Sequence, residues 1–505
     1  MKKTTLLILF IFCAMNIGAQ TQLGNSLPGE DMSNQSGTSI AMNNTGNFIV
    51  VGAPRAISAF NGGASIRGGH VRTYAYNGSG WTAGSDFDAE EKGDLMGFSV
   101  AVSGDGSIIA CGAPDGDPNG TNSGYVHVYL AQGSNPITPN SYIRLGEDLD
   151  GEATTDRFGQ SIAINDAGTR LIVGAPGGNY VKVFEKQAFA DPWTQLGQTL
   201  NGDGNNDRFG ISVSIDKDGD RIIIGATGND DNGQDSGRTK VYDLINGNWT
   251  QVGSNIDGAS GNRAGNSVDI SDNGNTIAVG FPGVSTLNIN RSGAVRIFTF
   301  DGTSWNQKGN DIVGRAFESL GGSGNDVQEG AIDLQAGGDR IVVGSKSYFD
   351  QGSTKKGHIT LYQFENGVWN QKGSVIGGVG ANDEFGTSVV INDSDGTIIA
   401  GGAPFADENG KNDSGHTRVY NLSVPLNVEI FDIENAISVF PNPSSNKISI
   451  QGFTIKKVDF FDSNGKKVKT ASSETIDISN LNSGIYFLKI ESDKNKFSYK
   501  KLVVN

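Results

Sequence analysis

The stretch FGISVSIDKDGDRIIIGA at residues 209–226 decides how most of the chain folds. Its first part alternates apolar with small or polar residues, which is the period of two typical of a β-strand. A turn at Asp218-Gly219 then leads into a second apolar strand that ends at Gly225-Ala226. A third strand up to Tyr242 and a fourth that contains Trp249 complete a unit of four short strands.

This unit recurs seven times, at an average spacing of about 58 residues. The second-strand glycines of the seven units are Gly52, Gly112, Gly174, Gly225, Gly280, Gly344 and Gly402. Six positions before each of them stands a hairpin glycine, namely Gly46, Gly106, Gly168, Gly219, Gly274, Gly338 and Gly396. The fixed interval predicts a rigid hairpin whose turn needs a positive φ. A four-stranded unit repeated at this period predicts a propeller blade rather than a solenoid rung.

The repeats also predict how the ring closes. Six units carry their own fourth strand, marked by Trp81, Tyr142, Trp193, Trp249, Trp305 and Trp369. The seventh unit stops after Tyr420, and Thr21-Gln22-Leu23-Gly24 repeats the fourth-strand sequence Thr194-Gln195-Leu196-Gly197. We therefore expect the N-terminal strand to pair into the last blade and remove the open edges. The tryptophans are interpreted as packing residues rather than a carbohydrate platform.

Composition agrees with an all-β class. The chain has 505 residues, of which 73 are glycine and 19% are charged. A helical solenoid would hold far fewer glycines, and collagen would place them with a period of three. Two cysteines cannot build a disulfide scaffold. The prediction is a seven-bladed β-propeller over residues 20–423, followed by a small Ig-like antiparallel β-sandwich.

Residues 1–19 have the layout of a secretory signal peptide. Lys2 and Lys3 precede an apolar run at 6–15 that is too short to span a bilayer, and Ala19 is the expected cleavage point before Gln20. The alternative is a buried first strand. No later stretch has about 18 consecutive apolar residues, so we expect no transmembrane segment in the mature chain. After cleavage Cys111 is the single cysteine, and it replaces the core valines of sister units.

The charge is distributed unevenly along the chain. The total is −16, but residues 20–436 hold 26 basic against 49 acidic residues, a formal charge of −23. Residues 437–505 hold 11 lysines against 6 acids, a charge of +5. Such an acidic body repels nucleic acid and anionic lipid, and it favours cations.

The repeats resemble the FG-GAP repeats of the integrin α-subunit propeller over about 400 residues. Phe158-Gly159, Phe209-Gly210 and Phe385-Gly386 match the first half of that motif. The second half is matched by Gly52-Ala53-Pro54, Gly112-Ala113-Pro114, Gly174-Ala175-Pro176 and Gly402-Ala403-Pro404. Gly225-Ala226-Thr227, Gly280-Phe281-Pro282 and Gly344-Ser345-Lys346 depart from it. The resemblance implies an extracellular binding or adhesion module.

The resemblance also raises the question of calcium, because integrin-like blades enclose it in a long acidic hairpin loop. The hairpin here is shorter, and its best candidates are Asp216, Asp218 and Asp220. An Asx-Gly turn without metal is the alternative. A second set of candidates follows the second strands: Asp115, Asp117, Asp230, Asp231, Asp235, Asp407 and Asp413. Loops between blades add further acids at the same face, which leads to the hypothesis that this face binds Ca²⁺ or a cationic ligand; a solvated acidic surface is the alternative.

No catalytic residues are assigned. His70, His358 and His416 all open third strands, and His127 lies between Val126 and Val128. No histidine pair has metal-ligand spacing, and no Ser or Cys stands in a nucleophile elbow. A non-enzymatic binding role is therefore expected, with a protein or glycan as ligand. The alternatives are a secreted hydrolase or lyase, acting on polysaccharide or protein at the acidic face, and a passive surface-coat component.

The C-terminal segment predicts a second domain with a different role. Residues 424–436 are interpreted as a linker, and residues 437–505 show short alternating strands. The residues that carry a second resemblance are Pro441, Asn442, Pro443, Gly465, Gly484, Tyr486 and Lys501. They resemble the type A sorting domain of the type IX secretion system. This implies that the type IX machinery carries the protein across the outer membrane of a Gram-negative bacterium, with removal of the domain and then release or surface attachment. An ordinary Ig-like binding module is the alternative.

Overall fold

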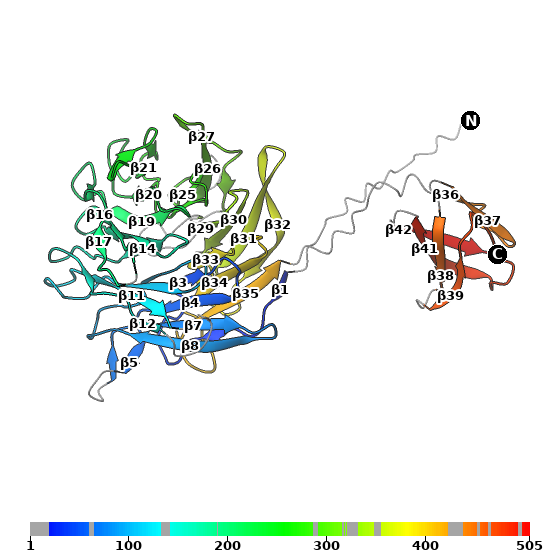
Figure 1. The fold of residues 1–505 in the computed structure, drawn as a ribbon, viewed down its shortest axis with the longest axis horizontal. Coiled ribbons are helices and arrows are strands. Elements are labelled where there is room, and N and C mark those ends of the chain that lie inside the picture. The colour runs from blue at the N-terminus through cyan, green and yellow to red at the C-terminus, as the bar shows by residue number, and fades with distance from the viewer. Residues whose placement is uncertain are drawn as a thin grey trace, which may run out of the picture. The chain divides into compact units, whose positions relative to one another are not determined.

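The computed structural model describes residues 20–59, 65–132, 142–188, 190–285, 291–315, 318, 320, 332–347, 355–422, 438–451, 455–462, 466–492 and 497–505. The predicted signal peptide at 1–19 with Ala19, the predicted linker at 424–436 and Gly465 lie outside these residues. The chain divides into two compact units, Met1–Ser423 and Val424–Asn505. The described residues form strands and connecting segments without a helix, which confirms the all-β class (Figure 1). None of them thus forms a helix that could cross a membrane.

The described part of the first unit contains seven antiparallel sheets of four or five strands, numbered here along the chain. Sheet 1 comprises β3 (Ser39–Met42), β4 (Phe48–Ala53), β7 (His70–Tyr76) and β8 (Trp81–Asp88). Sheet 2 comprises β9 (Ser99–Val102), β10 (Ile108–Ala113), β11 (Tyr125–Ala131), β12 (Tyr142–Arg144) and β13 (Leu149–Asp150). Sheet 3 comprises β14 (Ser161–Ile164), β15 (Arg170–Ala175), β16 (Tyr180–Glu185), β17 (Thr194–Gln195) and β18 (Leu200–Asn201). Sheet 4 comprises β19 (Phe209–Ile215), β20 (Arg221–Ala226), β21 (Arg238–Ile245), β22 (Asn248–Gln251) and β23 (Ile256–Asp257).

The remaining sheets repeat this pattern. Sheet 5 comprises β24 (Val268–Ile270), β25 (Thr276–Phe281), β26 (Ala294–Phe300), β27 (Trp305–Gln307) and β28 (Ile312–Val313). Sheet 6 comprises β29 (Ile332–Leu334), β30 (Arg340–Ser345), β31 (His358–Glu365) and β32 (Val368–Gly377). Sheet 7 comprises β33 (Ser388–Ile391), β34 (Ile398–Ala403), β35 (His416–Leu422), β1 (Gln20–Gln22) and β2 (Leu27–Pro28). Strands β5 (Ile57–Ala59) and β6 (Ser65–Arg67) form a separate hairpin.

The first strands of the seven sheets form a closed cycle. In the order β3, β9, β14, β19, β24, β29 and β33, each strand contacts the next, and β33 returns to contact β3. Figure 1 shows the yellow strands of sheet 7 beside the blue strands of sheet 1. We call this arrangement the sheet ring.

Sheet 7 is built from both ends of its unit. Strand β1 pairs with β35 in the register Gln20↔Leu422 to Gln22↔Tyr420, and the Leu23 amide donates to the Val419 carbonyl at 2.8 Å. Strand β2 pairs with the start of β35 and leaves the Leu27 side chain 3% exposed. The first described residues thus supply the outer strand of the last sheet.

The second-strand glycines allow each sheet to approach the next. A Cβ on Gly174 would lie 2.1 Å from the Gly210 carbonyl oxygen of the following sheet, which is closer than any real contact. Five sister glycines meet the next sheet in the same way, at 2.0–2.2 Å: Gly52, Gly112, Gly225, Gly344 and Gly402. Gly402 meets the Gly37 carbonyl and so closes the ring. These positions require glycine for close approach and not for a positive φ.

Two repeated hydrogen bonds accompany this contact. A first-strand serine donates from Oγ to the same carbonyl of the next sheet; the donors are Ser39, Ser99, Ser161, Ser212 and Ser388, at 2.7–2.8 Å. A fourth-strand tryptophan donates from Nε1 to a carbonyl of the preceding sheet's fourth strand or just beyond it; the donors are Trp81, Trp193, Trp249, Trp305 and Trp369, at 2.7–3.1 Å. Among the described residues, the pairs formed by sheets 2 and 3, 3 and 4, 4 and 5, and 7 and 1 have both bonds, so these neighbours are joined at the inner and the outer strands.

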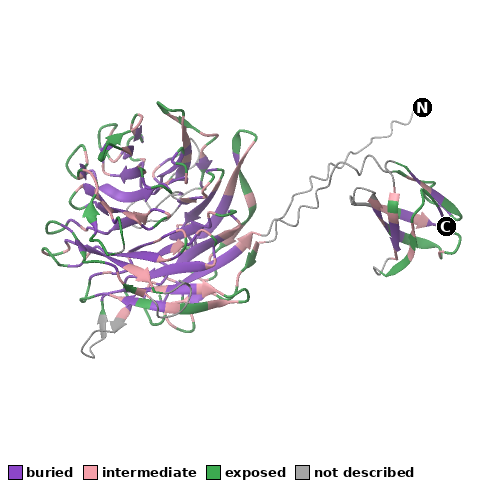
Figure 2. Cartoon of the chain, viewed as in Figure 1, coloured by how far each residue is buried: buried purple, intermediate pink, exposed green. Residues whose placement is uncertain are grey.

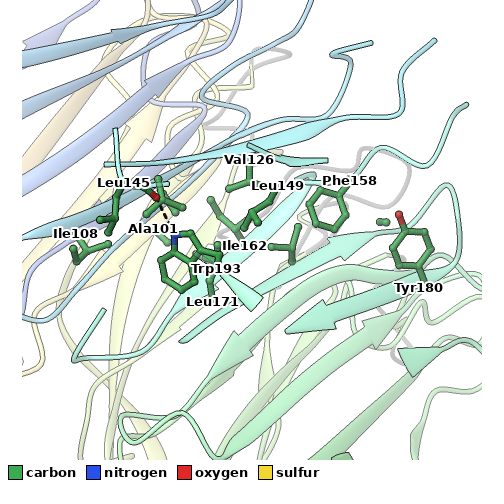
Figure 3. Close-up of a cluster of buried hydrophobic side chains, with 14 residues drawn as sticks. Ala101, Ile108, Val126, Leu145, Leu149, Phe158, Ile162, Leu171, Tyr180 and Trp193 are labelled. Carbon is green, nitrogen blue, oxygen red and sulfur yellow. Dashed lines mark hydrogen bonds between the residues drawn. The ribbon is translucent and has the colours of Figure 1, made fainter. Parts of the chain in front are cut away.

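The hydrophobic core lies between neighbouring sheets. Figure 2 shows the middle strands of the sheets as largely buried. One cluster joins sheets 2 and 3 and includes Ile108 of sheet 2 with Phe158, Ile162 and Leu171 of sheet 3 (Figure 3). Cys111 is fully buried in a similar cluster between sheets 1 and 2.

The second unit has two sheets around a separate core. One comprises β36 (Ser438–Phe440), β37 (Lys447–Gln451) and β40 (Thr475–Asp477). The other comprises β39 (Lys467–Ala471), β38 (Ile455–Phe461), β41 (Gly484–Ser492) and β42 (Phe497–Val504). The Asn442 side chain binds the last strand with both amide atoms: Nδ2 donates to the Lys501 carbonyl at 2.7 Å, and Oδ1 accepts from the Val503 amide at 2.8 Å.

Gly174→Ala tests the contact between sheets. The added Cβ would overlap the Gly210 carbonyl, so we expect a loss of at least about 2 kcal/mol in the free energy of unfolding. Urea denaturation followed by tryptophan fluorescence measures this. Gly80→Ala is the control, because a Cβ there meets nothing within 4 Å. Equal stability of the two variants would contradict the role given to the contact.

Candidate functional site

The acidic candidates of the second-to-third-strand loops lie at one end of their sheets. Because neighbouring strands are antiparallel, these loops and the links between sheets leave each sheet on the same side. The candidates fall in three loops: residues 114–124 of sheet 2, 227–237 of sheet 4 and 404–415 of sheet 7. We call this side of the sheet ring the loop end.

Three of these aspartates shape their own loops. Each accepts a hydrogen bond from a backbone N–H five or six residues later; the pairs are Asp117 with Asn122 (2.7 Å), Asp230 with Asp235 (2.7 Å) and Asp407 with Asp413 (3.0 Å). Such bonds order a loop without a metal ion.

Three others pair with arginines. Asp115 contacts Arg157 at 2.8 Å, Asp231 contacts Arg238 at 2.5 Å, and Asp235 contacts Arg263 at 3.3 Å. Asp231 and Asp235 remain half exposed, so these pairs contribute little to stability and leave carboxylate oxygens facing solvent.

The hairpin candidates form a turn. Asp216 is buried, and its Oδ1 accepts from the Asp220 and Arg221 amides at 2.9 and 3.0 Å, while Asp218 and Asp220 are exposed. Burial raises the pKa of Asp216 to about 7. Neutral side chains do the same in sister hairpins: Asn43, Ser103, Asn165, Ser271 and Asn392 accept from the equivalent amides. The turn therefore needs no charge and no metal at this position.

The structure does not bring the ten calcium candidates together. Sheets 2, 4 and 7 are not neighbours in the ring, and the hairpin of Asp216 emerges from the opposite side of sheet 4. Within the described part of the chain, one group of three or more acidic, His or Cys side chains has its ligand atoms within 4.8 Å of one another. That group is Glu90, His127 and Asp148, and it includes none of the ten.

A cavity of about 230 Å³ lies at the centre of the sheet ring, lined by residues of all seven first strands. Most of the lining residues are of apolar types, but Asp269, Asp333 and Asp393 also line the cavity. These three carboxylates were not among the predicted site residues.

The cavity aspartates bind neighbouring sheets to one another. Asp269 of sheet 5 accepts from the Leu334 amide of sheet 6 at 2.6 Å, and Asp333 accepts from the Ile391 amide of sheet 7 at 2.6 Å. Asp393 accepts from the Ala336 amide at 3.0 Å. Asp269 thus links sheets 5 and 6, and Asp333 and Asp393 link sheets 6 and 7.

This arrangement is electrostatically costly when all three groups are charged. Burial raises the pKa of Asp269, and burial with the neighbouring charges of Asp269 and Asp393 raises the pKa of Asp333 well above its usual range. Burial and nearby carboxylates also raise the pKa of Asp393 to about 7. Burial in the cavity therefore disfavours the charged form of all three carboxyl groups.

A signal for these residues is present in the repeats. Asp269 and Asp333 stand five positions before their hairpin glycines, where other units have the small residues Ala41, Ala101 and Ala163. An acid on a first strand, at the position where other units have alanine, is unusual enough to indicate a residue at the centre of the ring.

Comparison with known proteins identifies two segments. Residues 193–242 match a sequence model of the FG-GAP repeat, and residues 438–505 match a model of the secretion system C-terminal sorting domain. The chain therefore carries both kinds of module, and its sorting domain indicates export to the cell surface or medium through the type IX machinery.

Comparison of whole chains adds little. No curated protein matches the sequence. Hydrazine synthase from Kuenenia stuttgartiensis has a similar structure, with 13% identity and a TM-score of 0.47 over 75% of this chain and 94% of that chain.

Asp393→Asn tests the cost of the buried charge. A raised pKa in the folded state means that Asp393 lowers stability as pH rises from its unfolded pKa of about 4 to about 7. The amide keeps an acceptor for Ala336 but has no charge, so we expect a gain of roughly 1–4 kcal/mol at pH 8 and little change at pH 4.

Urea denaturation at both pH values measures the effect of Asp393→Asn. The control is Asp218→Asn in the exposed hairpin, which should change stability little at either pH. An equal change at pH 4 and pH 8 for Asp393→Asn would refute the electrostatic account.

Proposed function

We propose that the protein is an exported seven-bladed β-propeller that binds an extracellular protein or glycan through its loop end. The observation that carries the proposal is the sorting-domain match at residues 438–505, because export places the acidic loops in the extracellular medium. The closed cycle of first strands supports the propeller assignment, since each sheet then corresponds to one blade.

The properties of the loop end favour binding over catalysis. Its acids are held in place by turns and arginines, yet exposed oxygens remain, as in Asp231 and Asp235. A rigid scaffold that displays ordered, charged loops suits recognition of a cationic or cation-bridged surface.

Two of the histidines lie beside buried or half-buried glutamates: His358 contacts Glu318, and His416 Nδ1 lies 2.8 Å from Glu408.

The second unit is proposed to be an Ig-like sandwich that serves as the transport signal and is then removed. Its two sheets enclose one core, with Ile448 and Ile476 from one sheet and Phe460 and Leu488 from the other. Asn442 of the Pro441-Asn442-Pro443 segment holds the final strand, which explains why this motif and the terminal lysine strand occur together.

Deletion of residues 437–505 tests the transport role. The signal peptide would still direct the shortened chain to the periplasm, so we expect it to accumulate there. Cell fractionation and immunoblotting measure its location. Asn442→Ala should reduce export partly, because β42 loses both side-chain bonds, whereas Asn482→Ala is a control that keeps the main-chain acceptor of Tyr486. Unchanged export of the deletion variant would overturn the role.

The binding role is tested on the purified full chain. We expect selective binding on protein or glycan arrays and no turnover of polysaccharide or protein libraries. The double variant Asp231→Asn and Asp235→Asn should weaken that binding. The control Asp339→Asn should not weaken it; Asp339 is an exposed acid in the hairpin of sheet 6 that contacts Lys308. Turnover without selective binding would favour the hydrolase or lyase alternative. If neither turnover nor selective binding is observed, a passive coat protein is favoured.

A further inference from the structure

His127 has a buried ring nitrogen without a hydrogen-bond partner. The residue is the third of β11, and its side chain is 1% exposed. Its Nε2 forms no hydrogen bond with any described residue. The nearest carboxylate oxygens are Glu90 Oε1 at 3.5 Å and Asp148 Oδ2 at 3.6 Å, on either side of the same nitrogen. A buried polar atom aimed between two carboxylates is costly unless another group satisfies it.

Five of the other six sheets put a cation at this place. The third residue of the third strand faces the residue before the second-strand glycine, and it is Arg72, Lys182, Lys240, Arg296 or Arg418 in these five sheets and Thr360 in sheet 6. Three of these cations contact the acid that stands where Glu90 does, seven residues before Gly37, Gly159 or Gly210, as Glu90 stands before Gly97. The pairs are Arg72 with Glu30, Lys182 with Glu152 (2.5 Å) and Lys240 with Asp203 (2.5 Å). Arg72 also contacts Asp86, the counterpart of Asp148, at 2.5 Å.

Sheet 2 keeps the two acids but replaces the cation. His127 stands where Arg72 stands in sheet 1, between the same pair of carboxylates. Unlike an arginine or a lysine, an imidazole carries no fixed positive charge at neutral pH. Arg144 binds the other oxygen of Asp148, Oδ1, and leaves Oδ2 facing the imidazole. Glu90 therefore has no cation from β11.

The geometry fits a metal ion. Ligand atoms about 2.1 Å from a tetrahedral ion stand about 3.4 Å from one another, close to the observed 3.5 and 3.6 Å. His127 Nδ1 lies 3.3 Å from the Tyr129 hydroxyl, so an Nδ1–H can donate there and leave the Nε2 lone pair free. One imidazole with two carboxylates suits zinc and similar ions, whereas calcium takes oxygen ligands.

We propose that Glu90, His127 and Asp148 bind a divalent transition-metal ion of the zinc type, where the link between sheets 1 and 2 meets the third strand of sheet 2. The ion supplies the charge that Arg72, Lys182 and Lys240 supply in their own sheets. Glu90 is 58% and Asp148 36% exposed, so the site is open to solvent and keeps coordination positions for water or an external ligand. This site is separate from the calcium candidates and does not depend on the proposed binding role.

Calorimetric titration of the chelator-treated full chain with Zn²⁺ tests the proposal. We expect one site, and at least tenfold weaker affinity in Glu90→Gln and in Asp148→Asn. His127→Lys installs the residue of sheet 3 and should abolish binding while it preserves the fold. Glu152→Gln is the matched control, because Glu152 is the counterpart of Glu90 that already pairs with Lys182.

Co²⁺ provides a second readout, since its visible absorption reports nitrogen and oxygen ligation directly. The spectrum should appear with the parent chain and Glu152→Gln, and be absent with His127→Lys. Because Glu90 is exposed, Glu90→Gln should fold even if His127→Lys does not. No Zn²⁺ binding at about millimolar concentration, or full affinity in Glu90→Gln, would overturn the proposal.

Discussion

The contact of a second-strand glycine with a carbonyl of the next sheet is the constraint on which the sheet ring depends. At Gly174 no side chain fits, because Gly210 of the following sheet occupies the space of a Cβ. In each contact the second-strand glycine of one sheet meets a carbonyl of the next sheet, so the two sheets contribute different surfaces. Every sheet can therefore use both of its surfaces only when the last sheet meets the first. Gly402 and Ser388 make that final contact, both at the Gly37 carbonyl.

The sequence predicts those features that repeat. Both glycine series, the all-β class and the fourth-strand tryptophans can be recognised without coordinates, because each unit presents them at nearly constant spacing. The physical reason for the second-strand glycines is visible only in the structure, since the carbonyl that excludes a Cβ belongs to another repeat, 36 to 47 residues further along the chain or, for Gly402, at Gly37. Trp249 is likewise a packing residue, and its Nε1 bond to Leu196 adds a role that composition does not reveal.

The acidic loops are easier to find from the sequence than the groups of side chains around His127 and Asp269. Asp117 and Asp230 are conspicuous in the sequence, but their oxygens serve their own loops. Glu90 and His127 stand 37 positions apart in different repeats, so no local motif connects them. Aligning the repeats column by column would have shown a histidine among arginines and lysines, and an aspartate among alanines at Asp269. A residue that differs in type from its counterparts in the other repeats is thus more informative here than a high local number of charged residues.

The central claim is that residues 20–28 complete the last sheet and close the ring. Native-state hydrogen exchange of the full chain from Gln20 tests it most directly, read at the amide of Leu23, which donates to Val419. The account predicts that this amide exchanges as slowly as those of β35, because both are released only when the ring opens. Exchange of Leu23 at the rate of an unstructured peptide, with β35 protected, would contradict it.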